Sequence, residues 1–390
     1  MRKNFLPFSK PSIGPEEINE VVDSLKSGWI TTGPKVQIFE SNFARYFQSP
    51  HAVAVNSATS GLHIAYLAAG LQPGDEVITT PLTFVSTLSM LLAAGIKPVL
   101  SDIDLGTLNI DPGQIEKKIT RKTRAIVPVH FAGLPCDLDR IWAIARKHKL
   151  KVIEDAAHAL GTEYKGKKIG AASDAAVFSF HPIKNITTGE GGMITTPHKK
   201  WAEELTLLRF HGMSKSAWKR YSKSGSPLYE IERLGYKYNM LDLQAALGIH
   251  QLKKLKTFNQ IRARYAGIYH QKLSAYPEII LPQAPAFSHK HSWHLFVILL
   301  NTDRMTIDRN DLIQKLLEGN IGTGIHFTAV HRHRYYRKVL DLKYSLPHAD
   351  FVSSRILSLP LYPRMTEQDL RDVIQALEKI IKKYSKRKWL

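Results

Sequence analysis

The stretch Ser179-Phe-His-Pro-Ile-Lys184-Asn-Ile-Thr-Thr-Gly-Glu190-Gly-Gly-Met-Ile-Thr-Thr196 determines how the remainder of the chain is interpreted. An apolar run at Ala175–Phe180 leads into it and a second one ends it, which predicts two buried strands joined by a polar turn. Lys184 stands in that turn. Partial burial disfavours an ammonium group and lowers its pKa, so the free amine becomes a nucleophile or a base. Lys184 is therefore either an ordinary loop lysine or an amine that forms a Schiff base with an aldehyde cofactor.

Length and composition describe an ordinary globular protein. The 390 residues suffice for two domains with separate cores, and 44% of them are hydrophobic. No apolar run reaches the length of a membrane-spanning helix, and Met1–Leu6 lacks the apolar segment of a secretory signal. The single cysteine, Cys136, excludes an internal disulfide and a cysteine-cluster metal site, and we expect it to be a packing residue. We therefore expect a cytoplasmic protein with no metal and no membrane insertion.

The charge balance is strongly basic. The chain has 54 Lys and Arg residues against 34 Asp and Glu residues, a net charge of +20 that attracts anionic partners. Local clusters lie at Lys199–Lys200, Lys215–Arg220, His331–Lys338 and Lys382–Lys388. Because no zinc-finger spacing or RNP-type aromatic motif accompanies them, we expect no nucleic-acid partner. A basic regulator or nucleic-acid-binding protein without catalytic activity remains the alternative from another class.

Strand and helix patterns alternate through the first half of the chain. The predicted strands are Ala52–Val55, Glu76–Thr79, Pro98–Leu100, Ala125–Val129 and Val152–Glu154. Helical periods lie between them: the turn Asn56–Gly61 opens a helix to about Ala69, and others cover Phe84–Ala94 and Leu138–His148. This alternation predicts an α/β fold with a mostly parallel sheet covered by helices on both faces. Ligands of such sheets bind at the carboxyl ends of the strands.

The remaining segments predict an arm and a second domain. Residues 1–14 are irregular, Pro15–Leu25 is a helix, Trp29–Lys35 a turn-rich loop and Phe210–Tyr238 a long functional or subunit-spanning loop. Later predicted elements are helices at Asp242–Leu255, Phe258–Leu273, Asp311–Glu318 and Thr366–Tyr384, and a strand at Ser292–Leu300. We expect a large domain over residues 15–255 and a smaller α+β domain over residues 256–390.

Polar turns at the predicted strand ends supply candidate site residues. Asn56–Gly61 links a strand to a helix, where Ser57, Thr59 and Ser60 are either phosphate ligands or plain helix N-caps. Ser179 offers a further hydroxyl just before the lysine turn.

The run Lys151–His158 ends an apolar strand in two carboxylates and then reaches a histidine. A buried Asp155 needs a cationic partner, and a protonated pyridine nitrogen is one; otherwise Asp155 caps a helix and His158 is a core histidine. Phe84 follows another strand, where it can stack on a flat ring or belong to the core.

Together these stretches resemble the DegT/DnrJ/StrS family of pyridoxal-phosphate-dependent sugar aminotransferases, which have the type I aminotransferase fold. The resemblance covers nearly the whole chain and rests on residues Asn56–Gly61, Asp75–Thr83, Val152–His158, Phe178–Gly192, Gly235–Asn239 and Gly322–Phe327. Within the family the pattern is most similar to the branch that produces UDP-4-amino-4-deoxy-L-arabinose. The chain departs from that branch at Phe84, where the branch has tryptophan.

The resemblance implies a role for each candidate residue. Lys184 would bind the aldehyde of pyridoxal 5'-phosphate, Asp155 would pair with its ring nitrogen, and Phe84 and His158 would lie against its ring. Its phosphate would be held by Ser57, Thr59, Ser60 and Ser179, and by Asn239 of a neighbouring subunit in a homodimer with shared active sites. His326, His331, Glu190 and Tyr238 would bind substrate.

The resemblance also implies the reaction. The family transfers an amino group from L-glutamate to a nucleotide-linked ketosugar, and a lysine at position 184 argues against the branch that carries histidine there and dehydrates its substrate. The best-matching substrate is a UDP-4-keto-pentose, which the loop around Lys215–Lys223 also favours. Another UDP-, dTDP- or GDP-linked 4-keto-6-deoxy sugar is the alternative.

Overall fold

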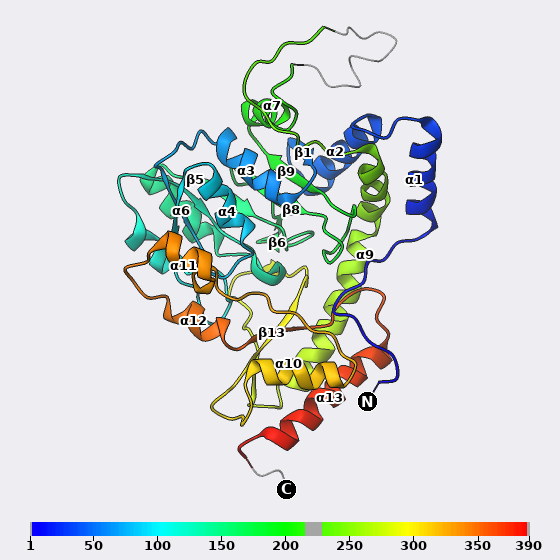
Figure 1. The fold of residues 1–390 in the computed structure, drawn as a ribbon, viewed down its shortest axis with the longest axis vertical. Coiled ribbons are helices and arrows are strands. Elements are labelled where there is room, and N and C mark those ends of the chain that lie inside the picture. The colour runs from blue at the N-terminus through cyan, green and yellow to red at the C-terminus, as the bar shows by residue number, and fades with distance from the viewer. Residues whose placement is uncertain (1, 215–227, 388–390) are drawn as a thin grey trace.

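The computed structural model describes residues 2–214 and 228–387. The basic cluster Lys215–Arg220 and the whole segment Lys215–Lys223 lie outside the described residues. Figure 1 shows an upper body built around a sheet and a smaller lower body that contains the C-terminal helix. Within the described ranges, no helix combines the length and the apolar character that a membrane crossing requires.

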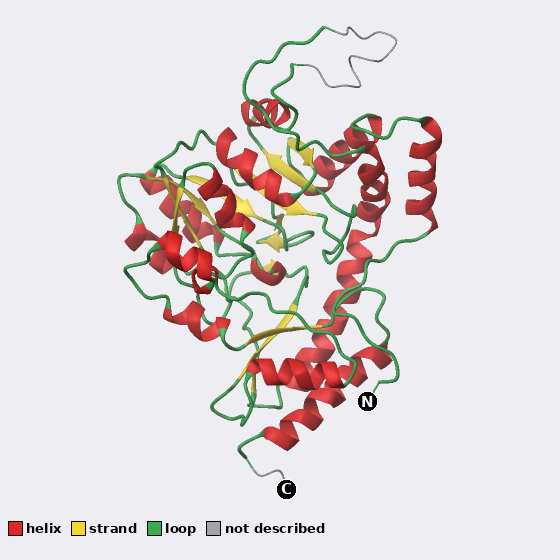
Figure 2. Cartoon of the chain, viewed as in Figure 1, coloured by secondary structure: helices red, strands yellow, loops and turns green. Residues whose placement is uncertain are grey.

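A seven-stranded sheet forms the centre of the upper body, with helices on its faces (Figure 2). Its order is β1-β9-β8-β5-β4-β2-β3, and β9 alone runs antiparallel to its neighbours. The strands are β1 (His51–Val55), β2 (Glu76–Thr79), β3 (Lys97–Leu100), β4 (Thr123–Val127), β5 (Lys151–Asp155), β8 (Ala175–Ser179) and β9 (Gly192–Thr196). Every residue of β8 and β9 is buried, as expected for strands covered on both faces. The predicted α/β fold with a mostly parallel sheet is confirmed.

Seven helices of the described chain precede, connect or follow these strands. They are α1 (Pro15–Ser27), α2 (Pro34–Phe47), α3 (Ala58–Ala68), α4 (Ser86–Ala93), α5 (Pro112–Ile115), α6 (Leu138–His148) and α7 (Lys199–Leu208). Helix α1 packs against α9 (Asp242–Leu273) rather than on the sheet. The predicted loop Trp29–Lys35 is shorter than expected, because Pro34 supplies the fixed φ of a first helical turn and begins α2. Phe39, Phe43 and Phe47 of α2 are fully buried in the core of the sheet. Cys136 is also buried in this core, which confirms it as a packing residue.

The lower body has its own core. Strands β10 (Ile279–Ile280), β12 (Phe296–Leu300) and β13 (Ile356–Leu359) form an antiparallel sheet, and α10 (Arg309–Glu318) and α13 (Glu367–Tyr384) pack on it. The predicted strand Ser292–Leu300 is wrong in its first four residues, which are irregular. Short elements complete the chain: β6 (Glu163–Tyr164), β7 (Lys167–Lys168), β11 (His289–Lys290), α11 (Arg334–Leu340) and α12 (Pro347–Ser353).

One continuous helix, α9 (Asp242–Leu273), joins the two bodies (Figure 1). The prediction of two separate helices with a break after Leu255 is wrong: neither proline nor glycine stands at residues 255–258, and the helix continues through Thr257, a residue type that can also begin a helix. Leu255 packs in the core of the large sheet, whereas Tyr265 and Tyr269 pack in the core of the lower body. The predicted domain boundary at residues 255 and 256 therefore falls inside a helix that both cores share.

The N-terminal arm packs on the lower body. Leu6 is buried in its core and forms a parallel bridge with Ile321. Phe8 stacks on His326 with ring centroids 5.1 Å apart. The irregular arm thus reaches a predicted substrate residue.

Candidate active site

The carboxyl ends of the parallel strands β1, β5 and β8 bring together segments that are distant in the sequence. Across the sheet, Ser179 at the end of β8 lies opposite Gly192, and Gly192 lies opposite Val55 at the end of β1. Asp155 ends β5 opposite Val177 of β8. The turn with Lys184, the carboxylate and the beginning of α3 consequently share one edge of the sheet, as the sequence predicts for ligands of parallel sheets.

Gly192 allows the helix α3 to approach this edge closely. A Cβ atom on Gly192 would lie 2.7 Å from the backbone nitrogen of Ala58 and 2.8 Å from the carbonyl oxygen of Ser57. A side chain at this position would displace the N-terminus of α3. The glycine therefore fixes the position of the helix N-terminus beside Ser179.

Lys184 presents an amine of lowered basicity. Its side chain is half-buried, and burial lowers the pKa of the amine to about 8, an effect that the negative charge of Asp155 partly opposes. Its backbone N–H donates to the carbonyl of His181 at 2.8 Å, which holds the tight turn after β8. About one amine in ten is therefore uncharged at pH 7, far more than for an ordinary lysine.

Asp155 is a buried carboxylate with a donor on each oxygen. Thr87 donates from its hydroxyl to Oδ2 at 2.7 Å, and the backbone N–H of Ala157 donates to Oδ1 at 3.1 Å. Burial raises the pKa of Asp155, while the two hydrogen bonds and the positive charge of Lys184 act in the opposite direction. The carboxylate is thus desolvated and would be stabilised by a further cation.

His158 is a buried neutral histidine near Lys184. Its Nδ1 accepts the backbone N–H of Ala132 at 3.3 Å, so the proton of the neutral ring is on Nε2. Burial, and then the charges of Lys184 and His326, lower the pKa of His158 well below its ordinary value. The ring stacks on Phe327 at 5.7 Å. It offers a flat apolar face that carries no charge at neutral pH.

His326 and His294 complete a group of imidazoles around the amine. Burial and the charge of Lys184 lower the pKa of His326 to about 3, and its Nδ1 lies 2.9 Å from the hydroxyl of Ser358. His294 lies with its ring 4.3 Å from that of His158, and burial lowers its pKa strongly. The structure therefore brings Lys184, Asp155, His158 and His326 close enough for the charge of Lys184 to act on the other three.

Hydroxyl groups gather at the beginning of α3. Ser57 is the N-cap and accepts the backbone N–H of Ser60 at 3.1 Å, and the two hydroxyls lie 2.9 Å apart. Ser60 also donates to the side-chain oxygen of Asn56 at 2.6 Å. Thr59 is half-buried in the first turn, and Ser179 is buried at the neighbouring strand end. A helix N-terminus with several hydroxyls favours an anion.

Phe84 and Glu190 are more open to solvent. Phe84 is 58% exposed and lies 6.2 Å from Phe327, so one ring face is free for stacking. Glu190 is exposed in the turn after Lys184, with Oε1 3.9 Å from Nε2 of His181.

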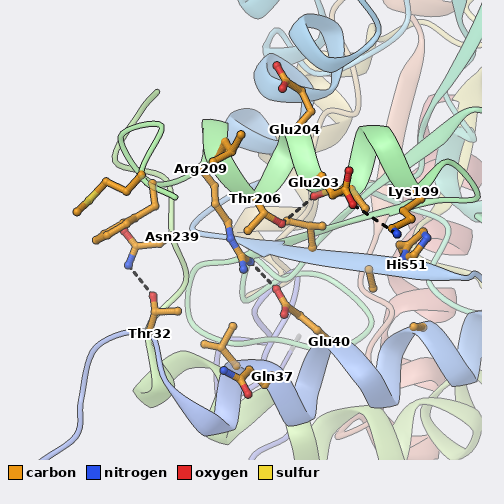
Figure 3. Close-up of a pocket in the computed structure, with 18 of the residues that line it drawn as sticks. Thr32, Gln37, Glu40, His51, Lys199, Glu203, Glu204, Thr206, Arg209 and Asn239 are labelled. Carbon is orange, nitrogen blue, oxygen red and sulfur yellow. Dashed lines mark hydrogen bonds and ion pairs between the residues drawn. The ribbon is translucent and has the colours of Figure 1, made fainter. Parts of the chain in front are cut away.

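Asn239 and Tyr238 lie beside the edge strand β1. The side chain of Asn239 donates to the hydroxyl of Thr32 at 2.7 Å, and both residues line a groove of about 1010 Å³ that Figure 3 shows. The hydroxyl of Tyr238 lies 3.2 Å from Nδ1 of His63, and its ring stacks on Tyr236. The two side chains form hydrogen bonds with Thr32 and His63, which lie outside the Lys184 group.

His331 lies in a separate pocket. Its Nε2 is 3.0 Å from Oδ1 of Asp350, which also pairs with Arg332 at 2.9 Å. Arg337 lines the same cavity of about 540 Å³. Among the residues that the structure describes, His331 is paired with Asp350 and has no contact with Lys184.

Sequence reasoning missed two residues of the site, Thr87 and His294. Thr87 reaches Asp155 from the first turn of α4, 68 residues away in the chain. Both ring nitrogens of His294 are buried without a hydrogen-bond partner among the described residues, which is unusual for a side chain only 2% exposed. The clue to Thr87 in the sequence is weak: this residue follows the predicted stacking residue Phe84 by three positions.

The arrangement fits pyridoxal phosphate by its donor set. The amine suits an aldehyde, the desolvated carboxylate suits a protonated ring nitrogen, and the hydroxyls at the α3 N-terminus suit a phosphate. No group of three or more metal-ligating side chains is placed to hold a metal within the part of the chain that the structure describes.

Comparison with known proteins agrees with this arrangement. The profile of the DegT/DnrJ/EryC1/StrS aminotransferase family matches residues 11–378. The spore coat polysaccharide biosynthesis protein SpsC of Bacillus subtilis is 50% identical over 386 residues, which are 98% of each chain.

Solved structures agree as well. The sugar aminotransferase Spr1654 of Streptococcus pneumoniae in its PMP form is 31% identical with a TM-score of 0.90, over 97% of this chain and 99% of that one. Helicobacter pylori PseC, an aminotransferase of pseudaminic acid biosynthesis, is 30% identical with a TM-score of 0.90, over 98% of this chain and 100% of that one. The chain therefore belongs to the DegT/DnrJ/EryC1/StrS aminotransferase family and is a pyridoxal-phosphate-dependent aminotransferase of the type I fold.

Proposed function

We propose that the protein transfers the amino group of L-glutamate to the 4-keto carbon of a nucleotide-linked sugar. The observation that carries this proposal is the Lys184 amine, whose pKa burial lowers to about 8, beside the buried carboxylate of Asp155. An amine of this kind can attack an aldehyde and can carry protons near neutral pH.

Each residue has a defined task in this proposal. Bound pyridoxal phosphate supplies an electron sink for the bonds at the substrate's amine-bearing carbon. Lys184 removes the proton from Cα of L-glutamate and, in the second half of the reaction, delivers one to carbon 4 of the sugar. Asp155 keeps the ring nitrogen protonated. The hydroxyls of Ser57, Thr59, Ser60 and Ser179 hold the phosphate, and Phe84 and His158 enclose the ring.

For the sugar, we propose a UDP-4-keto-pentose that is converted to UDP-4-amino-4-deoxy-L-arabinose. The support is the sequence pattern around His326, together with a net charge of +20 that favours a diphosphate. The charge of Lys184 acts on His326, and His331 lies with Arg332 and Arg337 in a pocket that we assign to the same substrate. A second candidate substrate is a 4-keto-6-deoxy sugar on UDP, dTDP or GDP, which the similarity to PseC favours.

The exposed apolar residues of α1 support a homodimer. Ile18, Val22 and Leu25 are 56%, 40% and 56% exposed and recur at the spacing of one helix face. Further exposed apolar side chains are Ile30, Ile38 and Leu241. In Figure 1, α1 lies at the outer edge of the molecule, beside α9. We infer that a second copy covers this face, and that Asn239 of each subunit completes the phosphate site of the other.

A panel of UDP-, dTDP- and GDP-linked 4-ketosugars tests the proposal, with L-glutamate as donor and release of 2-oxoglutarate as readout. Turnover of a UDP-4-keto-pentose at least about tenfold above the 6-deoxy sugars, measured as kcat/KM, is expected. Preference for a 6-deoxy sugar would select the second candidate. No 2-oxoglutarate from any ketosugar would contradict both.

The alternative of a non-catalytic basic regulator or nucleic-acid-binding protein has no support in the site. Non-specific phosphate contacts weaken steeply with salt, so duplex binding that persists at raised salt would be needed to revive it. We further infer a cytoplasmic location, which the single cysteine favours.

A further inference from the structure

Thr87 contacts two parts of the site that lie far apart in the sequence. It lies in the first turn of α4, is completely buried, and follows Phe84 by three residues. Its hydroxyl oxygen is 2.7 Å from Oδ2 of Asp155, 2.9 Å from the hydroxyl of Thr83 and 3.3 Å from the carbonyl oxygen of Phe84. A single hydroxyl thus touches the carboxylate and the segment that carries the exposed aromatic ring.

The number of protons in this group fixes the direction of its hydrogen bonds. An ionised carboxylate only accepts, so the one hydroxyl proton of Thr87 is donated to Asp155 at the shortest of its three contacts. Thr83, which is also buried, must then donate to Thr87. The result is a chain of two hydroxyls that points at Oδ2 and stabilises the negative charge. Hydrogen bonds to an ionised group are stronger than neutral ones, and their strength grows in a buried site.

We propose that Thr87 is a positioning residue that holds Asp155 ionised and oriented towards the ring nitrogen of pyridoxal phosphate. The inference rests on the proposed pairing of Asp155 with that nitrogen. Ala157 holds Oδ1 from the other side, so the two donors together fix the plane of the carboxylate. Without the Thr87 hydroxyl, Oδ2 would be buried with one donor fewer, and the carboxylate would be both less ionised and free to rotate.

The test compares Thr87→Val, which keeps the shape and removes the hydroxyl, with Thr87→Ser, which keeps the hydroxyl. Retention of pyridoxal phosphate, measured as the equilibrium dissociation constant of the holoenzyme, is the main readout and does not require turnover. Loss of one charge-assisted hydrogen bond predicts retention weaker by about tenfold or more in Thr87→Val. Thr87→Ser is expected within about threefold of the parent.

A double-mutant cycle shows whether Thr87 acts through Asp155. In an Asp155→Asn background the ionised acceptor is absent, so Thr87→Val is expected to change retention by less than about threefold. Thr206→Val is the control, because it removes a hydroxyl that donates to the carbonyl of Ala202 at 2.7 Å from an exposed position on α7. Thermal unfolding of the apo forms checks the fold, and Thr87→Ala removes the same hydroxyl with a smaller side chain.

Several results would overturn the inference. Equal defects in Thr87→Val and Thr87→Ser would mean that packing matters and the hydroxyl does not. If Thr87→Val and Asp155→Asn had fully additive effects on the free energy of cofactor binding, Thr87 would not act through Asp155. Parent-like retention in Thr87→Val, with Asp155→Asn defective, would overturn the role of Thr87 alone and leave the proposed function standing. Parent-like retention in Asp155→Asn would remove the proposed pairing itself and this inference with it.

Discussion

Lys184, in the turn after β8, and Asp155, at the end of β5, shift each other's pKa. The carboxylate raises the pKa of the amine, and the amine lowers the pKa of the carboxyl. Burial has the opposite effect on both and is the larger influence on each. The outcome is an amine with a pKa of about 8 and a carboxyl with a raised pKa. Burial of these two ionisable groups therefore destabilises the folded apoprotein, and a cofactor that pairs with both offsets that loss.

The rate at which the apoprotein takes up pyridoxal phosphate should rise with pH through a midpoint near 8, because the uncharged amine of Lys184 is the nucleophile. About one amine in ten is uncharged at pH 7 and about nine in ten at pH 9. In Asp155→Asn the midpoint should move to lower pH, since the charge that favours the ammonium is gone. The measurement is absorbance of the bound chromophore against time. A midpoint near 10.5, the ordinary lysine value, would contradict the lowered pKa.

Lys184→Ala should fold normally and lose turnover completely, because no other amine of the site can bond to the aldehyde. Borohydride reduction followed by mass spectrometry should find a pyridoxyl adduct on Lys184 in the parent and none in the variant. Lys199→Ala is the control, since Lys199 is an exposed lysine 3.9 Å from Glu203. Wild-type transamination by Lys184→Ala would refute the role of this lysine.

Asp155→Asn should stabilise the apoprotein while it weakens the holoenzyme. The folded-state pKa of Asp155 is raised, so its charge costs stability at a pH above that value, and the cost disappears as pH falls towards the ordinary value of 3.8. The apo variant should therefore melt above apo parent at pH 7, and the gap should close near pH 4. Scanning calorimetry of both apo forms measures this. An apo variant that melts below the parent at pH 7 would show that burial is not the main influence on the pKa of Asp155.

Arg209→Met should destabilise the fold by about 1–3 kcal/mol, the cost of leaving buried polar groups unpaired. Arg209 pairs with Glu40 (Figure 3), and the two side chains bind the free backbone groups of the edge strand β1. Glu40 accepts the N–H of Ala54 at 2.8 Å, and Arg209 donates to the carbonyl of Ala54 at 2.7 Å. The pair takes the place of a neighbouring strand and blocks edge-to-edge association. Urea unfolding measures the loss. Arg371→Met, which breaks an exposed pair with Glu367 on α13, should cost less than about 0.5 kcal/mol.

Shared active sites predict complementation between two inactive variants. In a hybrid dimer of Lys184→Ala and Asn239→Ala subunits, the site that keeps Lys184 would receive an intact Asn239 from its partner. Random mixing at equal amounts should therefore restore roughly a quarter of parental activity. The measurement is 2-oxoglutarate release after joint unfolding and refolding. Activity that stays at zero in the hybrid would place Asn239 in its own subunit's site.

Val22→Glu should place a charge in the apolar face of α1 and convert the dimer to monomers, which light scattering measures.

Local patterns predicted the sheet well because its strands are short, apolar and regularly spaced. The helix Leu138–His148 and the strand Glu76–Thr79 have the predicted bounds, since a capping Asp137 and an acidic turn mark them in the sequence. The break after Leu255 was predicted wrongly, because a helix that passes from one core to another changes its apolar face midway and looks like two helices.

The sequence alone determined which chemical groups the site contains: an amine in a tight turn, a carboxylate at a strand end and hydroxyls at a helix N-terminus. These depend on nearest neighbours in the chain, and a resemblance to a family could be stated on them. Only the tertiary structure decided how those groups act on one another, because Thr87 meets Asp155 across 68 residues and the burial that moves each pKa comes from elements far away in the chain. Pairing across a sheet edge and desolvation are properties of the packed fold, and no local pattern encodes them.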